Sequence, residues 1–305
     1  MHKTCVIITG PTAVGKTAVA LELAKHFSTD IISADSRQCY IEMNIGVAKP
    51  RPDELNAARH YFINSHHITD DLNAADFEAY ALGAVHDIFT RSDIAVMVGG
   101  TGLYIRAFCE GLDPVPPTDP LIRESLQKAF DENGIGYLQS QVQQLDPLYY
   151  REGEIHNPQR LMRALEVVMS TGRSIRSFQA GGKKKRDFFI IIINLELPRD
   201  ILYARINARV DQMMADGLLE EARGLWPYRH LNALQTVGYR ELFEYFEESG
   251  DKEDPVLLSK AVEKIKQNTR HYAKRQMTWF RREPGIISAA PDPKQVIRVL
   301  SDILT

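Results

Sequence analysis

The stretch "CVIITGPTAVGKT", residues 5–17, decides the fold of this 305-residue chain. Its first five residues are apolar or β-branched, which predicts a short buried strand. The strand stops at Gly10, where the chain begins to match the phosphate-binding pattern G-x-x-x-x-G-K-[ST]. Apolar residues then recur every four positions, as on one face of a helix: Val19, Leu23 and Phe27. A strand, a glycine loop and a helix in this order predict a loop that holds a di- or triphosphate at the helix N-terminus.

Three more apolar runs predict further strands of the same sheet. They are "DIISAD" (30–35), "DIAVMVGGTG" (93–102) and "FFIIIINLEL" (188–197). The last of them is apolar enough to be buried on both faces, as strands of parallel sheets are. Helical patterns lie between the runs. We therefore expect an α/β fold, in which a parallel sheet is flanked by helices.

The chain changes character after the proline-rich stretch "DPVPPTDP", which begins at Asp113. The segment that follows is helical and offers no strand candidate. Its apolar stripes are Leu138, Val142 and Leu145, and then Leu161, Leu165 and Val168. We expect a helical insertion domain over residues 113–186, and a catalytic core formed by residues 1–112 and 187–305.

Composition places the chain among ordinary globular proteins, because 44% of its residues are hydrophobic and 25% are charged. No run approaches the ~18 apolar residues of a membrane span. The N-terminus has no signal-peptide pattern, and the three cysteines form no C-x-x-C pair. These features favour a cytoplasmic protein with reduced thiols and no membrane partner.

The net charge of −3 hides two basic stretches. Residues 160–186 and residues 260–282 each hold eight Lys or Arg and one acid. Each stretch alone is typical of a solvated helix face, whereas two of them beside a phosphate loop are also typical of a protein that binds a polyanion. Both interpretations stay open at this point.

Two polar residues follow predicted strands. Asp35 ends the second strand, and Thr101 lies in the "GGTG" that ends the third. Ligands of open α/β sheets bind beyond the carboxyl ends of the strands, so both residues are expected near the phosphate loop. Asp35 is either the cap of the next helix or a general base, and one residue can serve as both.

Cations complete the expected anion site. Lys16 supplies a point charge, and the Thr17 hydroxyl is a candidate ligand of Mg²⁺. Arg205 and Arg209 are four residues apart and so share one helix face, which is either an exposed basic face or a clamp on a leaving diphosphate. The chain has no N-K-x-D motif, and no acid ends the apolar run before "GGTG". The sequence therefore does not require phosphoryl transfer.

Seven stretches together resemble one family, the tRNA dimethylallyltransferases, also called tRNA isopentenyltransferases, in their bacterial form. They are "GPTAVGKT", "DSRQ", "IGVAKP", "GGTGLY", "NPQRLMRALE", "TVGYRE" and "TRHYAKRQMTWFR", in this order from residue 10 to residue 281. The resemblance implies a P-loop NTPase-like core and a helical insertion that grips the anticodon stem-loop of tRNA.

The reaction that the resemblance implies is the transfer of a dimethylallyl group. The donor is dimethylallyl diphosphate, the acceptor is the exocyclic amine of adenosine 37, and the products are N6-dimethylallyladenosine and diphosphate. The loop would hold the donor diphosphate, although the same motif most often binds ATP or another nucleotide. Mg²⁺ is the expected cofactor. We expect a cytoplasmic monomer that needs no obligate protein partner.

The resemblance also implies site residues. Asp35 would be the general base, and Thr101 would position the amine. The residues implied for diphosphate or nucleotide binding are Gly10, Pro11, Thr12, Ala13, Val14, Gly15, Lys16, Thr17, Arg205 and Arg209, with Thr17 as the metal ligand. The residues implied for tRNA binding are Asp35, Ser36, Arg37, Gln38, Thr101, Arg123, Gln159, Arg160, Leu161, Met162 and Arg163.

Three other functions compete with this one. A P-loop kinase of a small molecule or nucleotide would turn over ATP and would not need two basic stretches. A non-enzymatic RNA-binding switch would bind RNA tightly without modifying it. A prenyltransferase of free adenine nucleotides would not need the basic helical insertion.

Overall fold

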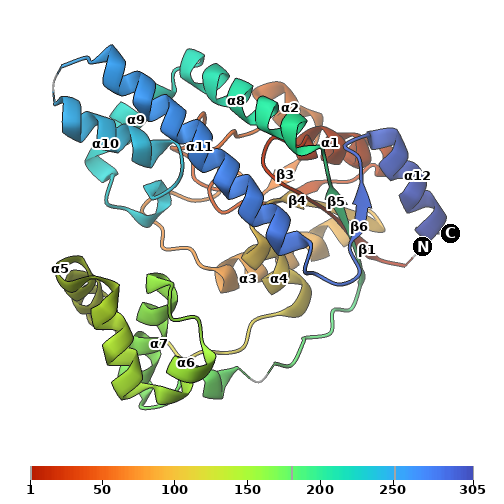
Figure 1. Ribbon diagram of the computed structural model, residues 1–305. Coiled ribbons are helices and arrows are strands. Elements are labelled where there is room, and N and C mark those ends of the chain that lie inside the picture. Colours follow the sequence, from red (N-terminus) through yellow and green to blue (C-terminus); the bar gives the residue numbers. More distant parts are fainter. Residues whose placement is uncertain (1, 180, 251, 305) are drawn as a thin grey trace. The chain divides into compact units, whose positions relative to one another are not determined.

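The computed structural model of the protein describes residues 2–179, 181–250 and 252–304 (Figure 1). Within these residues six strands form one sheet in the order β3-β2-β4-β1-β5-β6, and every neighbouring pair is parallel. The strands are β1 Thr4–Thr9, β2 Ile31–Ala34, β3 His60–Tyr61, β4 Ile94–Gly99, β5 Phe189–Leu195 and β6 Ile287–Ala289. The predicted parallel α/β sheet is confirmed.

The position of the central strand β1 explains the apolar run between its terminal threonines. Its neighbours β4 and β5 pair with it on both edges, and all six of its residues are buried. Cys5 and Ile7 belong to one hydrophobic core, while Val6 and Ile8 belong to a second core on the other face. A strand covered on both faces has no position where a polar side chain would meet water.

Helices cover each face of the sheet (Figure 1). The first core is closed by α3 Ala74–Phe89, α4 Gly102–Glu110, α9 Leu218–Leu225, α10 Tyr239–Ser249 and α11 Pro255–Phe280. The second is closed by α1 Lys16–Phe27, α8 Arg199–Ala215 and α12 Pro293–Leu304. The short helix α2 Pro52–Ala57 has no buried residue. No described helix has both the length and the hydropathy that a bilayer span needs.

The chain divides into two compact units, of which the larger comprises Met1–Glu110 and Lys185–Thr305. The smaller, Gly111–Lys184, is helical in all of its described secondary structure: α5 Pro120–Leu145, α6 Pro147–Glu152, α7 Pro158–Thr171 and a short 3-10 turn. Gly134 interrupts α5 with φ 70° and ψ −172°. The buried residues of this unit form a hydrophobic core of their own, which includes Leu138, Val142, Leu161 and Leu165.

Candidate active site

The phosphate loop turns sharply between β1 and α1. Gly10 has φ 138° and Gly15 has φ 110°, a region that side chains rarely adopt. A Cβ on Gly10 would also lie 2.7 Å from the Leu195 carbonyl oxygen. Helix α1 begins at the next residue, Lys16, and the first N–H groups of a helix have no partner inside it. The loop therefore presents backbone donors and the positive end of a helix dipole to an anion.

Lys16 folds back over this loop. Its Nζ donates hydrogen bonds to the carbonyl oxygens of Gly10, at 3.0 Å, and Pro11, at 2.9 Å. Burial lowers the pKa of its ammonium group from 10.5 to about 8, while nearby Asp35 opposes the shift and Arg209 adds to it. An ammonium group with this pKa sits close to its charge transition at the upper end of the physiological range.

The two arginines of α8 reach the same loop. Arg205 donates from Nη1 to the Val14 carbonyl oxygen at 3.3 Å, and Arg209 donates from Nη1 to the Thr12 hydroxyl at 3.5 Å. Both side chains remain exposed, so further guanidinium donors face solvent. Both guanidinium groups therefore lie at the phosphate loop.

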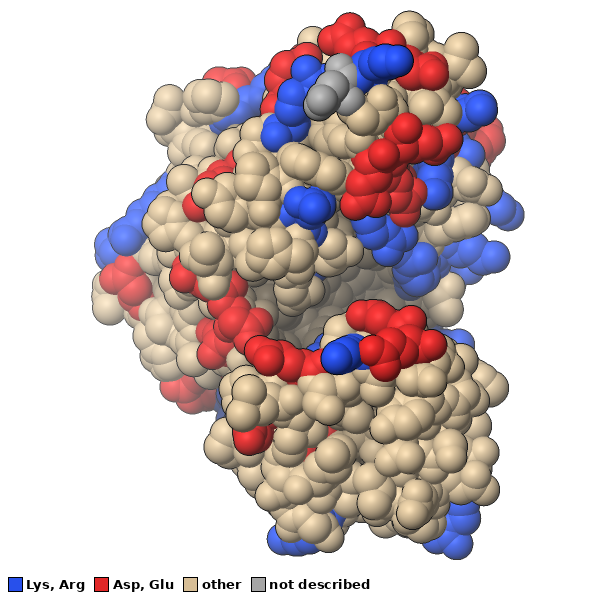
Figure 2. All heavy atoms as spheres, turned by 90° about the vertical axis from the view of Figure 1, so that its left-hand side faces the viewer, with Lys and Arg blue, Asp and Glu red and all other residues tan. Residues whose placement is uncertain are grey.

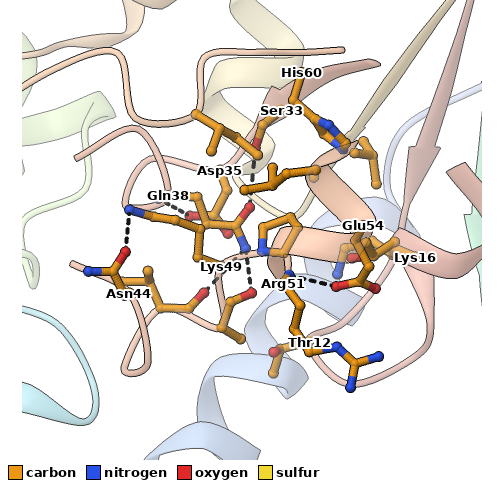
Figure 3. Close-up of a pocket in the computed structure, with 18 of the residues that line it drawn as sticks. Thr12, Lys16, Ser33, Asp35, Gln38, Asn44, Lys49, Arg51, Glu54 and His60 are labelled. Carbon is orange, nitrogen blue, oxygen red and sulfur yellow. Dashed lines mark hydrogen bonds between the residues drawn. The ribbon is translucent and has the colours of Figure 1, made fainter. Parts of the chain in front are cut away.

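Asp35 comes directly after β2 and points into the cavity that the phosphate loop borders (Figure 3). Its Oδ1 accepts hydrogen bonds from the backbone N–H groups of Arg37, at 2.9 Å, and Gln38, at 3.3 Å. The carboxylate thus caps a turn of residues 36–39, whereas the cap interpretation predicted a helix there. No described residue donates to its Oδ2, so the second oxygen remains available to a ligand.

Thr101 is held beside Asp35 by the turn after β2. Its hydroxyl accepts a hydrogen bond from the backbone N–H of Ser36 at 3.1 Å, and lies 3.4 Å from the Ser36 hydroxyl. Its own N–H donates to the Ala34 carbonyl oxygen at 3.2 Å. The carboxyl ends of β2 and β4 therefore bring a carboxylate and a hydroxyl together, as the strand pattern predicted.

The site is a cavity of about 890 Å³. Figure 3 shows Thr12, Lys16 and Asp35 among the side chains that line it. Apolar side chains share the lining: Ile45, Val47, Leu55, Ile63, Val98 and Met213. A pocket of this volume that combines an anion cradle with apolar walls fits a small apolar group attached to phosphate.

One wall of the cavity is the loop of residues 44–49, which Glu221 of α9 anchors. Its carboxylate accepts hydrogen bonds from three consecutive N–H groups, those of Asn44 at 3.1 Å, Ile45 at 2.8 Å and Gly46 at 2.9 Å. The Tyr239 hydroxyl donates to the same carboxylate at 2.6 Å. A Cβ on Gly46 would lie 2.6 Å from the Tyr239 ring, which explains the glycine.

Two polar side chains hold the same loop from inside the cavity (Figure 3). Gln38 donates from Nε2 to the carbonyl oxygens of Val47, at 3.2 Å, and Ala48, at 3.0 Å. Lys49 donates from Nζ to Asn44 Oδ1 at 3.1 Å, and also to the Tyr40 carbonyl oxygen at 2.7 Å and to Asn64 Oδ1 at 2.6 Å, which lie outside this loop. Gln38 is one of the residues expected to bind tRNA, but its amide donors are already used within the protein.

The candidates on the helical unit form a network around a buried acid. Glu166 is 4% exposed, and its two oxygens bind Arg123 Nη1 at 2.6 Å and Arg163 Nη1 at 3.0 Å. Arg123 also donates to the Gln159 side chain. Arg160 is exposed, and no described residue bonds its guanidinium. Three of these candidates are thus held together, and the fourth projects into solvent.

Leu161 and Met162 behave differently from their neighbours. Both are fully buried in the core of the helical unit. The expectation that they contact tRNA therefore cannot apply to their side chains. Their place on α7 follows from the helical period, which turns every third or fourth residue inward while Arg160 and Arg163 turn outward.

Charge is mixed on the face of the molecule that Figure 2 draws. Lys and Arg there lie beside Asp and Glu, and the described residues form no single continuous basic surface on this face. The described residues also contain no group of three or more His, Cys, Asp or Glu side chains arranged to hold a metal ion.

Comparison with known proteins identifies the family. The sequence model described as IPP transferase matches residues 38–283. The chain is 49% identical to a tRNA dimethylallyltransferase of Christiangramia forsetii, over 92% of this chain and 90% of that protein. It is 45% identical to tRNA dimethylallyltransferase 1 of Bacteroides thetaiotaomicron, over 93% and 90%.

A solved structure agrees with these relatives. The chain superposes on the full-length tRNA isopentenylpyrophosphate transferase of Bacillus halodurans with a TM-score of 0.70 and 32% identity, over 99% of this chain and 95% of that one. The resemblance seen in the motifs is confirmed, and the family supports a prenyl transfer over the kinase alternative. The chain therefore belongs to the IPP transferase family and is an enzyme that transfers a prenyl group.

Proposed function

We propose that this enzyme transfers the dimethylallyl group of dimethylallyl diphosphate to the exocyclic amine of adenosine 37 in tRNA, giving N6-dimethylallyladenosine and diphosphate. The observation that carries the proposal is that the phosphate loop, with Lys16, and Asp35 line one and the same cavity. One side of that cavity suits a diphosphate. The other offers a carboxylate where the acceptor amine would lose its proton.

The donor site follows from the cations around the loop. The diphosphate would lie at the N-terminus of α1, where Lys16, Arg205 and Arg209 converge. Negative charge grows on the diphosphate as its bond to the dimethylallyl carbon breaks. Fixed cations directed at that charge lower the barrier without needing to reorganise during the reaction. The apolar side chains of the cavity would surround the dimethylallyl group.

Mg²⁺ fits the donor set at the start of α1. The ion prefers oxygen ligands, and it commonly binds through one or two protein oxygens together with substrate phosphates. Thr17 lines the cavity directly after Lys16 and would supply a hydroxyl oxygen. A bound Mg²⁺ would neutralise part of the diphosphate charge.

The acceptor side is built by the turn after β2. An aromatic amine is a weak nucleophile, so it benefits from a base that removes its proton as the new C–N bond forms. Asp35 would take that proton on Oδ2, while the C–O bond to the diphosphate breaks and the electron pair leaves with it. The Thr101 hydroxyl would hold the amine in place. The adenine of adenosine 37 must leave its stack in the tRNA to reach the cavity.

The helical unit would bind the anticodon stem-loop of the tRNA. The support is a set of three arginines on α5 and α7, of which Arg160 is exposed and Arg123 and Arg163 are half-exposed. We propose that the enzyme works in the cytoplasm, where a tRNA substrate would be found, and as a monomer without an obligate protein partner.

Replacing Arg160 and Arg163 by Ala should weaken tRNA binding and flatten its dependence on salt. Each lost phosphate contact should reduce the slope of log K against log salt concentration by roughly 0.7 to 1. Titrations of labelled tRNA at several salt concentrations measure this slope. Lys128→Ala, an exposed cation on α5 that the proposal leaves outside the interface, is the matched control. An unchanged slope in the double variant would remove both arginines from the RNA face.

The function itself is tested by product analysis. The purified protein is incubated with unmodified tRNA, Mg²⁺ and dimethylallyl diphosphate, in the absence of ATP, and the digested nucleosides are weighed by mass spectrometry. A dimethylallyl-modified adenosine supports both the reaction and the identity of the phosphate in the loop. Absence of this product, together with phosphate release when ATP is added, would favour the kinase or an ATPase instead.

A further inference from the structure

One face of helix α11 lines the candidate active-site cavity. Tyr272 and Gln276 are four residues apart and therefore lie on the same side of the helix. Tyr272 lines the same cavity as Asp35. Gln276, which is 6% exposed, reaches the phosphate loop and the loop after β4 at the same time.

The Gln276 amide uses both of its ends. Its Oε1 accepts a hydrogen bond from the Thr12 backbone N–H at 2.8 Å, and its Nε2 donates to the Gly100 carbonyl oxygen at 3.0 Å. Among the described residues, no backbone–backbone hydrogen bond joins the phosphate loop directly to the loop after β4. The carboxamide is therefore a direct bridge from the loop that would hold the donor to the loop that carries Thr101.

The glycines of the "GGTG" stretch leave room for this helix. A Cβ on Gly100 would collide with Nε2 of Gln276, and a Cβ on Gly102 would collide with the Trp279 indole nitrogen. Gly100 has no positive φ, so its backbone alone does not require glycine. Space for the amide of Gln276 does require it. Two separate sequence features, Gly100 and Gln276, thus serve one contact.

We propose that Gln276 is a positioning residue that sets the donor diphosphate and the acceptor amine at reacting distance. The proposal rests on the prenyl transfer proposed above. A carboxamide can accept from an N–H and donate to a C=O through one rigid planar group without carrying a charge. An ionised Glu has acceptors alone, and it would place a negative charge against the Gly100 carbonyl oxygen. Misplacement of reacting groups by about 1 Å can cost ~10²-fold in rate.

Gln276→Glu is therefore expected to slow single-turnover prenyl transfer by roughly 10- to 100-fold at saturating substrates. The dissociation constant of each substrate, measured separately for dimethylallyl diphosphate and for tRNA, should change less than about threefold, because each loop keeps its own ligand contacts. Gln267→Glu is the matched control. Gln267 lies on the same helix, but it is exposed and is not one of the residues that line the cavity.

Gly100→Ala separates positioning from a general loss of folding. In the parent protein the new Cβ would displace the Gln276 amide, so prenyl transfer should slow by a similar factor. In the Gln276→Ala background the amide is gone, and Gly100→Ala should cost little more. Such non-additivity is the mark of two residues that act through one contact. Thermal unfolding of all four proteins identifies any variant that is simply unfolded.

The outcomes are distinct. A parent protein that makes no dimethylallyl-modified adenosine would refute the proposed function. If the parent is active, two results would overturn the role of Gln276: a single-turnover rate of Gln276→Glu equal to that of the parent, or additive effects of Gly100→Ala and Gln276→Ala. A weakened affinity for one substrate, with an unchanged saturated rate, would make Gln276 a ligand of that substrate instead.

Discussion

Asp35→Asn is expected to slow the chemical step of prenyl transfer by roughly 10²-fold or more while tRNA affinity stays nearly unchanged. Asn keeps the shape of the side chain and an oxygen that can accept from the N–H groups of Arg37 and Gln38, so the turn after β2 should survive. What Asn lacks is a basic oxygen for the amine proton. The substitution thus removes the base and keeps the cap.

Single-turnover rates at saturating substrates and equilibrium binding of tRNA measure the two effects separately. Asp35→Ala removes base and cap together, so a further loss in that variant reports the contribution of the turn. Glu54→Gln is the control, since Glu54 is another carboxylate that lines the same cavity. A full rate in Asp35→Asn, with weakened tRNA binding in Asp35→Ala, would make Asp35 a structural cap alone.

The sequence predicts the strands that have four or more residues. Strands β1, β2, β4 and β5 follow apolar runs that extend over four or more residues. The sequence pattern does not predict strands β3 and β6. They are two and three residues long, which is too short to show a hydrophobic period. Their pairing depends on strands β2 and β5, which lie elsewhere in the chain.

The sequence predicts those parts of the site whose position follows from the order of the strands in the sheet. Asp35 and Thr101 end strands that are neighbours in a parallel sheet, so their meeting could be predicted from the strand pattern. Arg205 and Arg209 could be assigned to one helix face, but helical spacing does not say what lies opposite that face. Their contact with the phosphate loop needed the structure.

The contacts that hold the cavity together could not be predicted in this way. Gln276 lies 264 residues from its partner Thr12, and Glu221 lies 177 residues from Asn44. Both residues sit in ordinary helical sequence, and nothing in their local pattern distinguishes a bridging side chain from an exposed one. The clearest sequence signal of these contacts is a glycine on the facing loop. Gly100 faces Gln276 itself, and Gly46 faces Tyr239, whose hydroxyl bonds Glu221.

Lys16→Ala is expected to weaken binding of dimethylallyl diphosphate by roughly 10- to 100-fold at pH 7, because hydrogen bonds to charged groups contribute about 1.5 to 3 kcal/mol. The parent protein should show a matching dependence on pH. Burial lowers the pKa of Lys16 to about 8, so the ammonium group is charged below pH 8 and loses its proton above it. The phosphates are already ionised in this range, since their second pKa lies near ~6.

Affinity for the donor should therefore be constant from about pH 7 to 8 and then fall by up to about tenfold per pH unit, because the bound diphosphate stabilises the charged form. Lys16→Ala should abolish this fall. Burial also lowers the pKa of Lys49, in the same cavity, to about 8, so Lys49→Arg is the necessary control. Arg stays charged throughout, and the fall should persist in that variant if Lys16 is its source. A flat profile in Lys49→Arg, with the fall retained in Lys16→Ala, would assign the titration to the wall of the cavity rather than to the phosphate loop.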